Sequence, residues 1–215
     1  MIPIIGIKKN RKVIICVAII LLFHLVGLTG LLMPGMAPLF LKIVPWHLLL
    51  MALILFISHD DTDVKFLLFV ICTISLGYGF EWLGVHQHNL FGDYYYGQTL
   101  GAKVSDVPLI ISANWFLLIY SAGALMQRSR LRSKILRIII GALFLVFLDI
   151  LIEPVASRLD YWHWANDIIP IRNYTCWFLV SSLMLFIFES FRFKKQSLVA
   201  PVFLITQFLF FTVMY

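Results

Sequence analysis

The sequence predicts an all-α integral membrane protein in which about seven transmembrane helices form one bundle. Three observations lead to this fold class. The 215-residue chain is 61% hydrophobic and 13% charged, which excludes a soluble globular domain and a disordered chain. It contains seven apolar windows of about 20 residues, each long enough to cross roughly 30 Å of hydrocarbon. Its basic residues divide unequally between the two sides of such a bundle. We expect a single polytopic domain over residues 1–215.

The spans follow one another with short connections. The first window, about 13–32, follows a basic run and resembles a signal peptide, but it is too long and has no small-residue cleavage site, so we interpret it as a span. The second window, about 39–57, is interrupted by Pro45. The other expected spans cover about 64–85, 107–126, 135–155, 172–191 and 197–214.

The distribution of Lys and Arg fixes the expected orientation. With seven spans, thirteen of these residues fall on the side of the N-terminus, and only Lys42, Lys103, Arg158 and Arg172 fall on the other. The positive-inside rule therefore places the N-terminus in the cytoplasm and the C-terminus outside. The net charge of +6 reflects this topology and does not indicate nucleic-acid binding. The basic loop 127–137 is first a topology anchor and second a possible contact for phospholipid headgroups.

With this topology, most of the unusual polar and aromatic residues fall in the outer leaflet. Ionisable groups inside a membrane are costly and usually serve a function. We therefore expect one pocket at the outer end of the bundle. Its candidate catalytic residues are Glu81, Asp93, Asp149 and Glu153, and its candidate substrate-binding residues are Trp82, Tyr94, Tyr95, Tyr96, Asn114, Trp115, Trp162, Trp164, Asn173 and Tyr174.

Asp149 and Glu153 are four residues apart, so they share one helix face, which should point into the bundle. Burial and a neighbouring like charge both favour the neutral form of a carboxyl group, and a neutral carboxyl is what a general acid needs. The alternative is a structural network with Arg158 or Arg172. Pro154 is expected to mark the end of this helix.

The connection 86–106 is long for a compact bundle, and such loops are often functional or partly re-entrant. Glu81 precedes it among glycines 77, 79 and 84, which permit close helix approach or a ligand beside the backbone. The tyrosines at 94–96 have an alternative explanation as an interfacial aromatic belt. The flanking glycines and Asp93 favour a pocket instead.

The histidines provide a weaker signal. His86 and His88 form a His-x-His pair, for which His47, His163 and Asp93 are possible third metal ligands. Because the sequence fixes no third ligand, we expect no metal site. His24, in the middle of the first span, is expected to be a hydrogen-bonded core residue.

The chain lacks a nucleotide-binding glycine pattern, a Cys-x-x-Cys pair, a nucleophile elbow and an HExxH motif. Buried acids and aromatic rings instead suit acid-initiated chemistry on a lipophilic alkene. A carboxyl group would protonate the double bond, aromatic faces and carboxylates would stabilise the cation, and water would capture it.

Short motifs occur in order between about residues 70 and 180. They are Gly79-Phe80-Glu81-Trp82-Leu83-Gly84-Val85, Phe91-Gly92-x-Tyr94-x-Tyr96, Leu100-Gly101, Val107-Pro108-Leu109, Asn114-Trp115-Phe116, Leu148-Asp149-x-x-x-Glu153-Pro154, Tyr161-Trp162-x-Trp164, Ile169-Pro170 and Asn173-Tyr174-x-x-Trp177. Together they resemble the CruF-type carotenoid hydratases, a bacterial and archaeal family of membrane carotenoid biosynthesis proteins. That family often has aspartate where this chain has Glu153, a change of one methylene in reach.

The resemblance implies addition of water to the terminal double bond of an acyclic carotenoid end group, as in lycopene or γ-carotene, without a cofactor. The expected partners are a carotenoid from the bilayer, water, membrane lipids and other enzymes of carotenoid synthesis, with no nucleic acid. The expected location is the bacterial inner (cell) membrane. Two alternatives stay open: a carotenoid or terpenoid cyclase or isomerase with the same acid chemistry, and a non-catalytic lipid- or pigment-binding protein. A microbial rhodopsin is not expected, because it needs a Schiff-base lysine in its last span and residues 197–214 contain no lysine.

Overall fold

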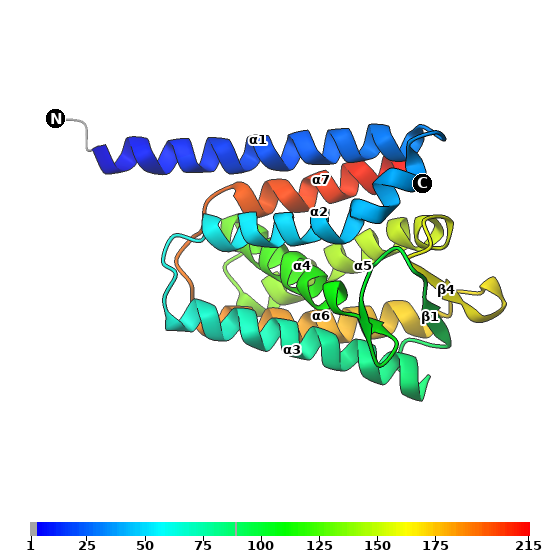
Figure 1. Cartoon of the computed structure of the whole chain (residues 1–215). Helices are drawn as coiled ribbons and strands as arrows, with labels where there is room; N and C mark the ends of the chain where they lie inside the picture. The colour runs from blue at the N-terminus through cyan, green and yellow to red at the C-terminus, as the bar shows by residue number, and fades with distance from the viewer. Residues whose placement is uncertain (1–3, 89) are drawn as a thin grey trace.

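The computed structural model describes residues 4–88 and 90–215, with side chains from residue 11 onward. Within these residues seven helices form a bundle (Figure 1). They are α1 (Ile4–Leu32), α2 (Ala37–Ser58), α3 (Val64–Gln87), α4 (Leu109–Arg128), α5 (Lys134–Arg158), α6 (Ile171–Phe191) and α7 (Val199–Met214). Six helices of the described chain are long and apolar enough to cross a membrane, and α7 is a shorter apolar helix of 16 residues. The all-α membrane bundle expected from the sequence is confirmed.

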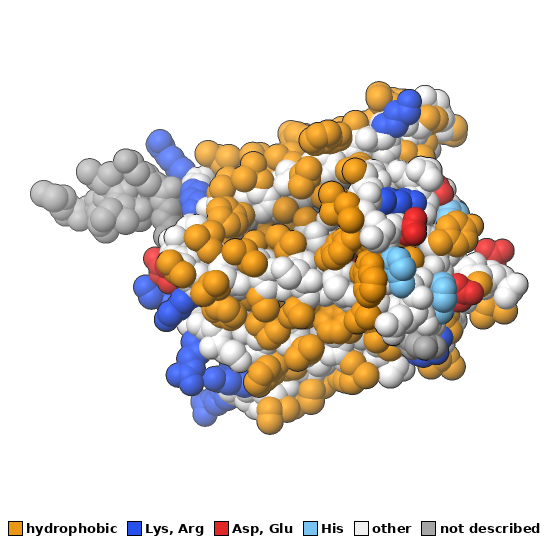
Figure 2. Space-filling view, turned by 60° about the horizontal axis from the view of Figure 1, so that its bottom comes forward, with side chains coloured by type: hydrophobic (Ala, Val, Ile, Leu, Met, Phe, Trp, Pro, Cys, Tyr) orange, Lys and Arg blue, Asp and Glu red, His pale blue; other side chains and the backbone are white. Residues whose placement is uncertain are grey.

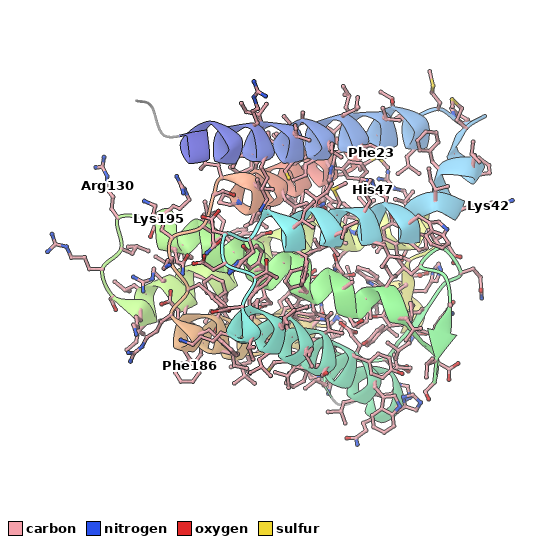
Figure 3. All side chains as sticks on the ribbon, turned by 60° about the vertical axis from the view of Figure 1, so that its left-hand side comes forward. Phe23, Lys42, His47, Arg130, Phe186 and Lys195 are labelled. Atoms are coloured by element: carbon pink, nitrogen blue, oxygen red, sulfur yellow. The ribbon has the colours of Figure 1, made fainter. Side chains whose placement is uncertain are left out.

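Helix α4 lies at the centre of the bundle, where it packs against α2, α3, α5, α6 and α7. Most of its side chains are buried, and Leu117, Ile119 and Ala122 have no exposed surface. A helix that is apolar all round belongs in such a position. The surrounding helices expose apolar side chains outward. Phe186 of α6, for example, is 59% exposed and points away from the bundle (Figure 3). This outward apolar surface suits contact with lipid chains.

Charged side chains gather at the ends of the bundle. Figure 2 shows Lys and Arg clustered at one end, with hydrophobic side chains covering the flank between the ends. Arg130 and Lys195 lie at this basic end, and Lys42 lies at the opposite end (Figure 3). The separation has the form that the sequence predicts, while the assignment of the basic end to the cytoplasm stays a prediction.

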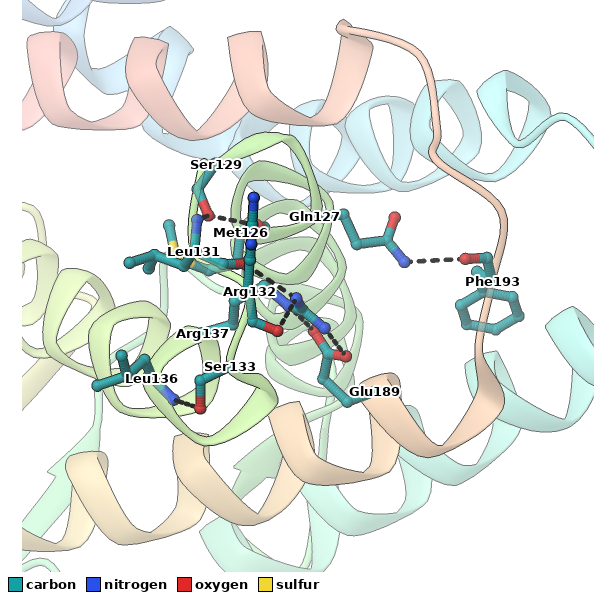
Figure 4. A network of polar contacts seen from close by, with 10 residues as sticks. All are labelled: Met126, Gln127, Ser129, Leu131, Arg132, Ser133, Leu136, Arg137, Glu189 and Phe193. Atoms are coloured by element: carbon teal, nitrogen blue, oxygen red, sulfur yellow. Dashed lines mark hydrogen bonds and ion pairs between the residues drawn. The ribbon is translucent and has the colours of Figure 1, made fainter.

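A network of polar contacts joins the helices at the basic end (Figure 4). The Arg137 guanidinium of α5 makes two bonds of 2.7 Å to the Glu189 carboxylate of α6. The Gln127 amide of α4 donates to the Phe193 carbonyl at 3.1 Å. The bidentate ion pair between Arg137 and Glu189 fixes α5 against α6 and is mostly shielded from solvent.

The opposite end of the bundle is covered by short strands, which we call the outer cap (residues 90–108 and 160–170). Strand β1 (Tyr94–Tyr96) pairs antiparallel with β4 (Trp162–Trp164), so that Tyr94 lies opposite Trp164. Strands β2 (Lys103–Val104) and β3 (Val107–Pro108) form a small hairpin, and the 3₁₀ helix η1 (Ala165–Asp167) follows β4. The long connection therefore folds as strands and turns in its described residues, rather than as a re-entrant helix.

The expectation that Pro154 ends the fifth helix is wrong. Helix α5 continues through Pro154 to Arg158, and Val155 and Ala156 are completely buried. Proline removes one backbone hydrogen bond. Ending the helix in apolar surroundings would leave several backbone groups unpaired, which costs more. The additional turn also brings the chain to the start of β4, close to the carboxylates of α5.

Candidate active site

Glu81 is buried and accepts hydrogen bonds from three aromatic side chains. The Tyr94 and Tyr96 hydroxyls donate to Oε2 at 2.7 and 2.6 Å, and the Trp115 indole donates to Oε1 at 2.8 Å. Only 5% of Glu81 is exposed. Gly77, one helical turn earlier, makes this approach possible, because a Cβ atom there would lie 2.6 Å from the Trp115 Cβ. The glycine beside this acid thus serves close helix packing, one of the two roles expected from the sequence.

Glu153 and Asp149 form the second group of buried acids. The Trp162 and Trp164 indoles donate to Glu153 Oε2 at 3.1 and 2.6 Å. The Asn173 amide nitrogen of α6 donates to both acids, at 2.9 Å to Glu153 Oε1 and 2.9 Å to Asp149 Oδ2. Asp149 Oδ1 is buried and has no hydrogen-bond partner among the described residues. The two acids therefore share one inward face, as their spacing predicts.

The alternative of a structural ion-pair network does not fit this arrangement. Arg158 donates to the Met214 carbonyl, and Arg172 donates to the His88 carbonyl at 2.9 Å. Across the described residues, the side chains that donate to the three acids are all uncharged Tyr, Trp or Asn. Carboxyl groups gathered without a cation in an apolar interior are suited to exchanging protons with a substrate.

A cavity of about 30 Å³, which we call the polar chamber, lies between Glu81 and Glu153. This is enough space for about one water molecule. Asp149 does not line it and reaches it only through Asn173 and Glu153. The lining consists of the two acids and surrounding aromatic, aliphatic and amide side chains: Glu81, Phe91, Tyr94, Tyr96, Ile111, Asn114, Trp115, Ile152, Glu153, Trp162, Trp164, Asn173 and Trp177.

The two tyrosines on the cap act as hydrogen-bond donors at neutral pH. Burial raises the pKa of Tyr94 and Tyr96 well above the ordinary value, and the neighbouring Glu81 carboxylate raises each pKa further. Both phenols therefore keep their protons and present O–H groups to Glu81. Their role in this geometry is to donate hydrogen bonds to Glu81, in addition to lining the chamber.

Several expected residues lie outside the polar chamber. Side chains in a strand alternate between faces, so when Tyr94 and Tyr96 point inward, Tyr95 points outward, where it is 61% exposed and stacks on His163. The structure therefore corrects the expectation that all three tyrosines line one pocket. Asp93, directly before the strand, also points outward. Its carboxylate is 67% exposed and lies 3.1 Å from His88 Nδ1, so Asp93 is not one of the buried acids.

Two more of the expected residues, Trp82 and Tyr174, lie on helices and also point away from the polar chamber. Trp82 is adjacent to Glu81 but lies about 100° around the helix. It is 37% exposed and stacks on His86. Tyr174 follows Asn173 and is likewise turned away, so it does not line the chamber. A residue next to a site residue in a helix is thus a poor candidate for the same pocket.

The histidines do not gather around a common point in the described chain, where no group of three potential metal ligands occurs. His86 Nδ1 lies 2.9 Å from the Trp82 carbonyl oxygen. The expected core role of His24 is confirmed: Nδ1 lies 2.7 Å from the Ile20 carbonyl oxygen and Nε2 lies 2.8 Å from the Gln207 amide nitrogen.

Trp177 lines the chamber but is absent from the residues expected from the sequence. Its ring stacks on Trp115, with centroids 4.6 Å apart and planes 21° apart. It follows Asn173 by four residues and therefore lies on the same helix face. The four-residue spacing from Asn173 is therefore the feature of the sequence that points to Trp177 as a chamber residue. Ile111 and Ile152 also line the chamber, and no chemical signal distinguishes them from other apolar residues of their spans.

Fold and site together define a polytopic all-α membrane protein with buried carboxyl groups under an aromatic cap. A family model described as "Carotenoid biosynthesis protein" matches residues 41–215, which include α2 to α7 and all three buried acids. The chain belongs to this family and has a role in carotenoid biosynthesis. No curated protein and no solved structure gives a significant match to it.

Proposed function

We propose that this protein is a carotenoid hydratase of the bacterial cell membrane, adding water to the terminal double bond of an acyclic carotenoid end group. The observation that carries the proposal is the polar chamber, where Glu81 and Glu153 face a space for about one water molecule. Family membership supports a carotenoid substrate. Water is the only co-reactant, and the chemistry requires an acid, a cation-stabilising environment and a base.

Glu153 is the proposed proton donor. It faces the chamber, while Asp149 stands behind it and is linked to it through the Asn173 amide. The π electrons of the terminal double bond take the proton of the Glu153 carboxyl, which forms a C–H bond at the less substituted carbon. The more substituted carbon becomes a tertiary cation, and Glu153 becomes a carboxylate. Asp149 is the nearest acid from which the proton can be replaced.

Glu81 is the proposed base and cation stabiliser. Glu81 and Glu153 each accept three hydrogen bonds, but Glu153 shares the Asn173 amide with Asp149, and a neighbouring like charge opposes ionisation of that pair. Glu81 shares its donors with no other acid of the described residues, so we assign it the negative charge that stabilises the nearby cation. Indole faces in the chamber wall, such as that of Trp177, add cation–π attraction. The oxygen of the chamber water bonds to the cationic carbon and releases one proton to Glu81. The product is a tertiary alcohol, and proton transfer from Glu81 back toward Glu153 completes the cycle.

The test is expression in a lycopene-producing bacterium, with chromatography and mass analysis of the pigments. The wild type should convert the acyclic carotenoid to a product heavier by one water. Glu81→Gln, Asp149→Asn and Glu153→Gln should lose most of this product, because each change removes a proton-transfer group while keeping its shape. Asp93→Asn is the matched control, since this exposed acid lies outside the chamber and should retain wild-type yield.

The outcomes separate the possible functions. A new pigment of unchanged mass would indicate a cyclase or an isomerase and contradict the hydratase. Absence of any new product from acyclic and monocyclic precursors would leave a pigment-binding role and also contradict it. Full activity in all three acid variants would overturn the assigned residues even if hydration occurs.

A further inference from the structure

A second cavity, of about 380 Å³, lies between α1, α2, α4 and α7 and is mostly apolar. We call it the apolar cavity. Its size falls in the range of about 300–1,000 Å³ typical of sites for small organic ligands. The proton-transfer scheme above makes no use of it.

The apolar cavity borders the polar chamber. Ile111, Asn114, Ile152 and Trp162 line both spaces, so these four side chains form the junction between them. The two spaces differ in kind. The polar chamber has two carboxyl groups and room for about one water, whereas the apolar cavity is more than ten times larger and contains no carboxylate among its lining residues. The large space suits a hydrocarbon and the small one suits water.

The rim of the apolar cavity is formed by α1 and α2. Phe23 and Val26 of α1 and Ile43 and Trp46 of α2 line the cavity and are 43%, 46%, 43% and 70% exposed. Figure 3 shows Phe23 and His47 between these two helices, on the flank of the bundle rather than at its charged ends. In a membrane this flank faces lipid chains. A lipophilic molecule can therefore reach the cavity sideways without passing through water.

Gly27 gives the cavity part of its width. It lines the cavity, and a Cβ atom added there would meet no other atom within 4 Å. Gly30, one turn along the same helix, behaves in the opposite way: its added Cβ would lie 2.3 Å from the Phe40 ring, so it brings α1 and α2 together. One glycine thus closes the two helices against each other, while the other leaves space between them.

We propose that the apolar cavity binds the polyene chain of the substrate. The chain enters from the bilayer between α1 and α2, occupies the space beside Gly27, and presents its terminal double bond at the junction beside Asn114. The acid and the water then lie beyond the junction. This arrangement rests on the hydratase function proposed above and adds where the hydrocarbon binds, how it arrives and which residues set the available width.

The test fills the cavity from Gly27. The series Gly27→Ala, Gly27→Leu and Gly27→Phe adds increasing volume in open space. Purified protein from lycopene-producing cells is assayed for bound pigment by absorbance, in the Glu153→Gln background where substrate accumulates, and for hydrated product in the otherwise wild-type chain. Bound pigment and product should fall in order of side-chain size, and Gly27→Phe should reduce both to background.

The matched control is Gly79→Phe on α3, where an added Cβ also meets nothing within 4 Å and which lines neither space. It should bind and hydrate like the wild type. If Gly27→Leu and Gly27→Phe also do so, the proposed binding site is wrong while the hydratase function stands. If Gly27→Phe fails to accumulate, the smaller Gly27→Leu decides. If the wild type binds pigment that the Gly27 series displaces, but never hydrates it, the hydratase proposal fails and the binding site stands.

Discussion

Glu81 depends on hydrogen bonds from side chains 13 and 15 residues further along the chain, which the outer cap brings within 2.7 Å. Such a bond to a charged group contributes about 1.5–3 kcal/mol, which corresponds to roughly 10- to 150-fold in rate if it acts in the transition state. Tyr96→Phe removes the hydroxyl and keeps the ring. We expect this variant to lower the hydration rate by roughly 10- to 150-fold. The measurement is the initial rate of product formation in membranes of known protein content.

Tyr95→Phe is the corresponding control. Its ring lies on the outer face of the same strand against His163, so loss of its hydroxyl should leave the rate unchanged. Equal slowing by the two variants would contradict the hydrogen-bonding role of Tyr96 and would instead indicate a general loss of cap structure.

Asp160 holds the two parts of the outer cap together. Its carboxylate lies 2.8 Å from His163 Nε2 and accepts from the Gln98 backbone N–H at 2.7 Å. The hydrogen bond with His163, followed by that from Gln98, lowers the pKa of Asp160. A lowered pKa in the folded state contributes stability above the unfolded pKa, and this stability is lost as the pH falls through the folded pKa.

Asp160→Asn should therefore lower the thermal unfolding temperature at neutral pH, and the difference from wild type should shrink as the pH falls below the ordinary titration range of aspartate. Asparagine tolerates the left-handed backbone at this position, where φ is 54°. Asp106→Asn, at an exposed aspartate with φ 62°, is the control for the backbone conformation and should leave the unfolding temperature at neutral pH unchanged. A difference that persists unchanged at low pH would contradict the role of the Asp160 charge.

The buried acids themselves could be predicted from the sequence, because the cost of a carboxyl group in a membrane makes each one conspicuous. Their partners were harder to predict. Asp93 carries the same carboxyl group as Asp149, but it lies in the outer cap and its side chain points away from the chamber. That direction follows from the strand register, which depends on pairing between residues almost 70 positions apart. Composition and spacing do not contain that information.

At the scale of elements, hydropathy predicts the helices well, since each described helix overlaps one expected span. The short strands of the cap gave no such signal. Strands of two or three residues do not establish an alternating pattern, and their pairing is set by the helix ends that carry them. The expectation for Pro154 fails for a related reason, because the requirement that backbone groups in an apolar bundle stay paired outweighs the local effect of proline.

One buried hydrogen bond joins the first and last helices. The Gln207 amide nitrogen of α7 lies 2.8 Å from His24 Nε2 of α1, and both residues are largely buried. Gln207→Leu removes the donor and leaves the His24 nitrogen unpaired. We expect a loss of about 0.6 kcal/mol in unfolding free energy, the average for such bonds between membrane helices, and at most about 1.7 kcal/mol. The measurement is denaturant unfolding of the purified protein in detergent.

Thr206→Val serves as the comparison, because the Thr206 hydroxyl bonds only within its own helix, to the Val202 carbonyl. Its effect should be smaller. Replacing both partners, as His24→Leu with Gln207→Leu, should recover part of the loss, since no polar group is then left unpaired. A double variant that loses the full sum of the single effects would contradict the proposed coupling.

At the scale of the whole molecule, the start of α1 and the end of α7 lie at opposite ends of the bundle (Figure 1). The basic end carries Arg130 and Lys195 and is expected to face the cytoplasm. A green fluorescent protein that folds only in the cytoplasm should stay dark when fused after Tyr215, whereas alkaline phosphatase at the same position should be active. Fusions within the basic loop 129–133 should give the reverse result. A bright fusion after Tyr215 would contradict the predicted orientation.

The sideways position of the apolar cavity has a consequence for how the protein must be assayed. Its rim residues Phe23, Ile43 and Trp46 meet lipid, so a ligand arriving there is diluted by lipid rather than by buffer. The substrate concentration that gives half the maximal rate should therefore be expressed as the ratio of pigment to lipid molecules in the membrane, not as pigment per volume of buffer. Adding empty vesicles that fuse with the enzyme's membrane would slow turnover at constant total pigment, and concentrating the same vesicles in less buffer would leave it unchanged.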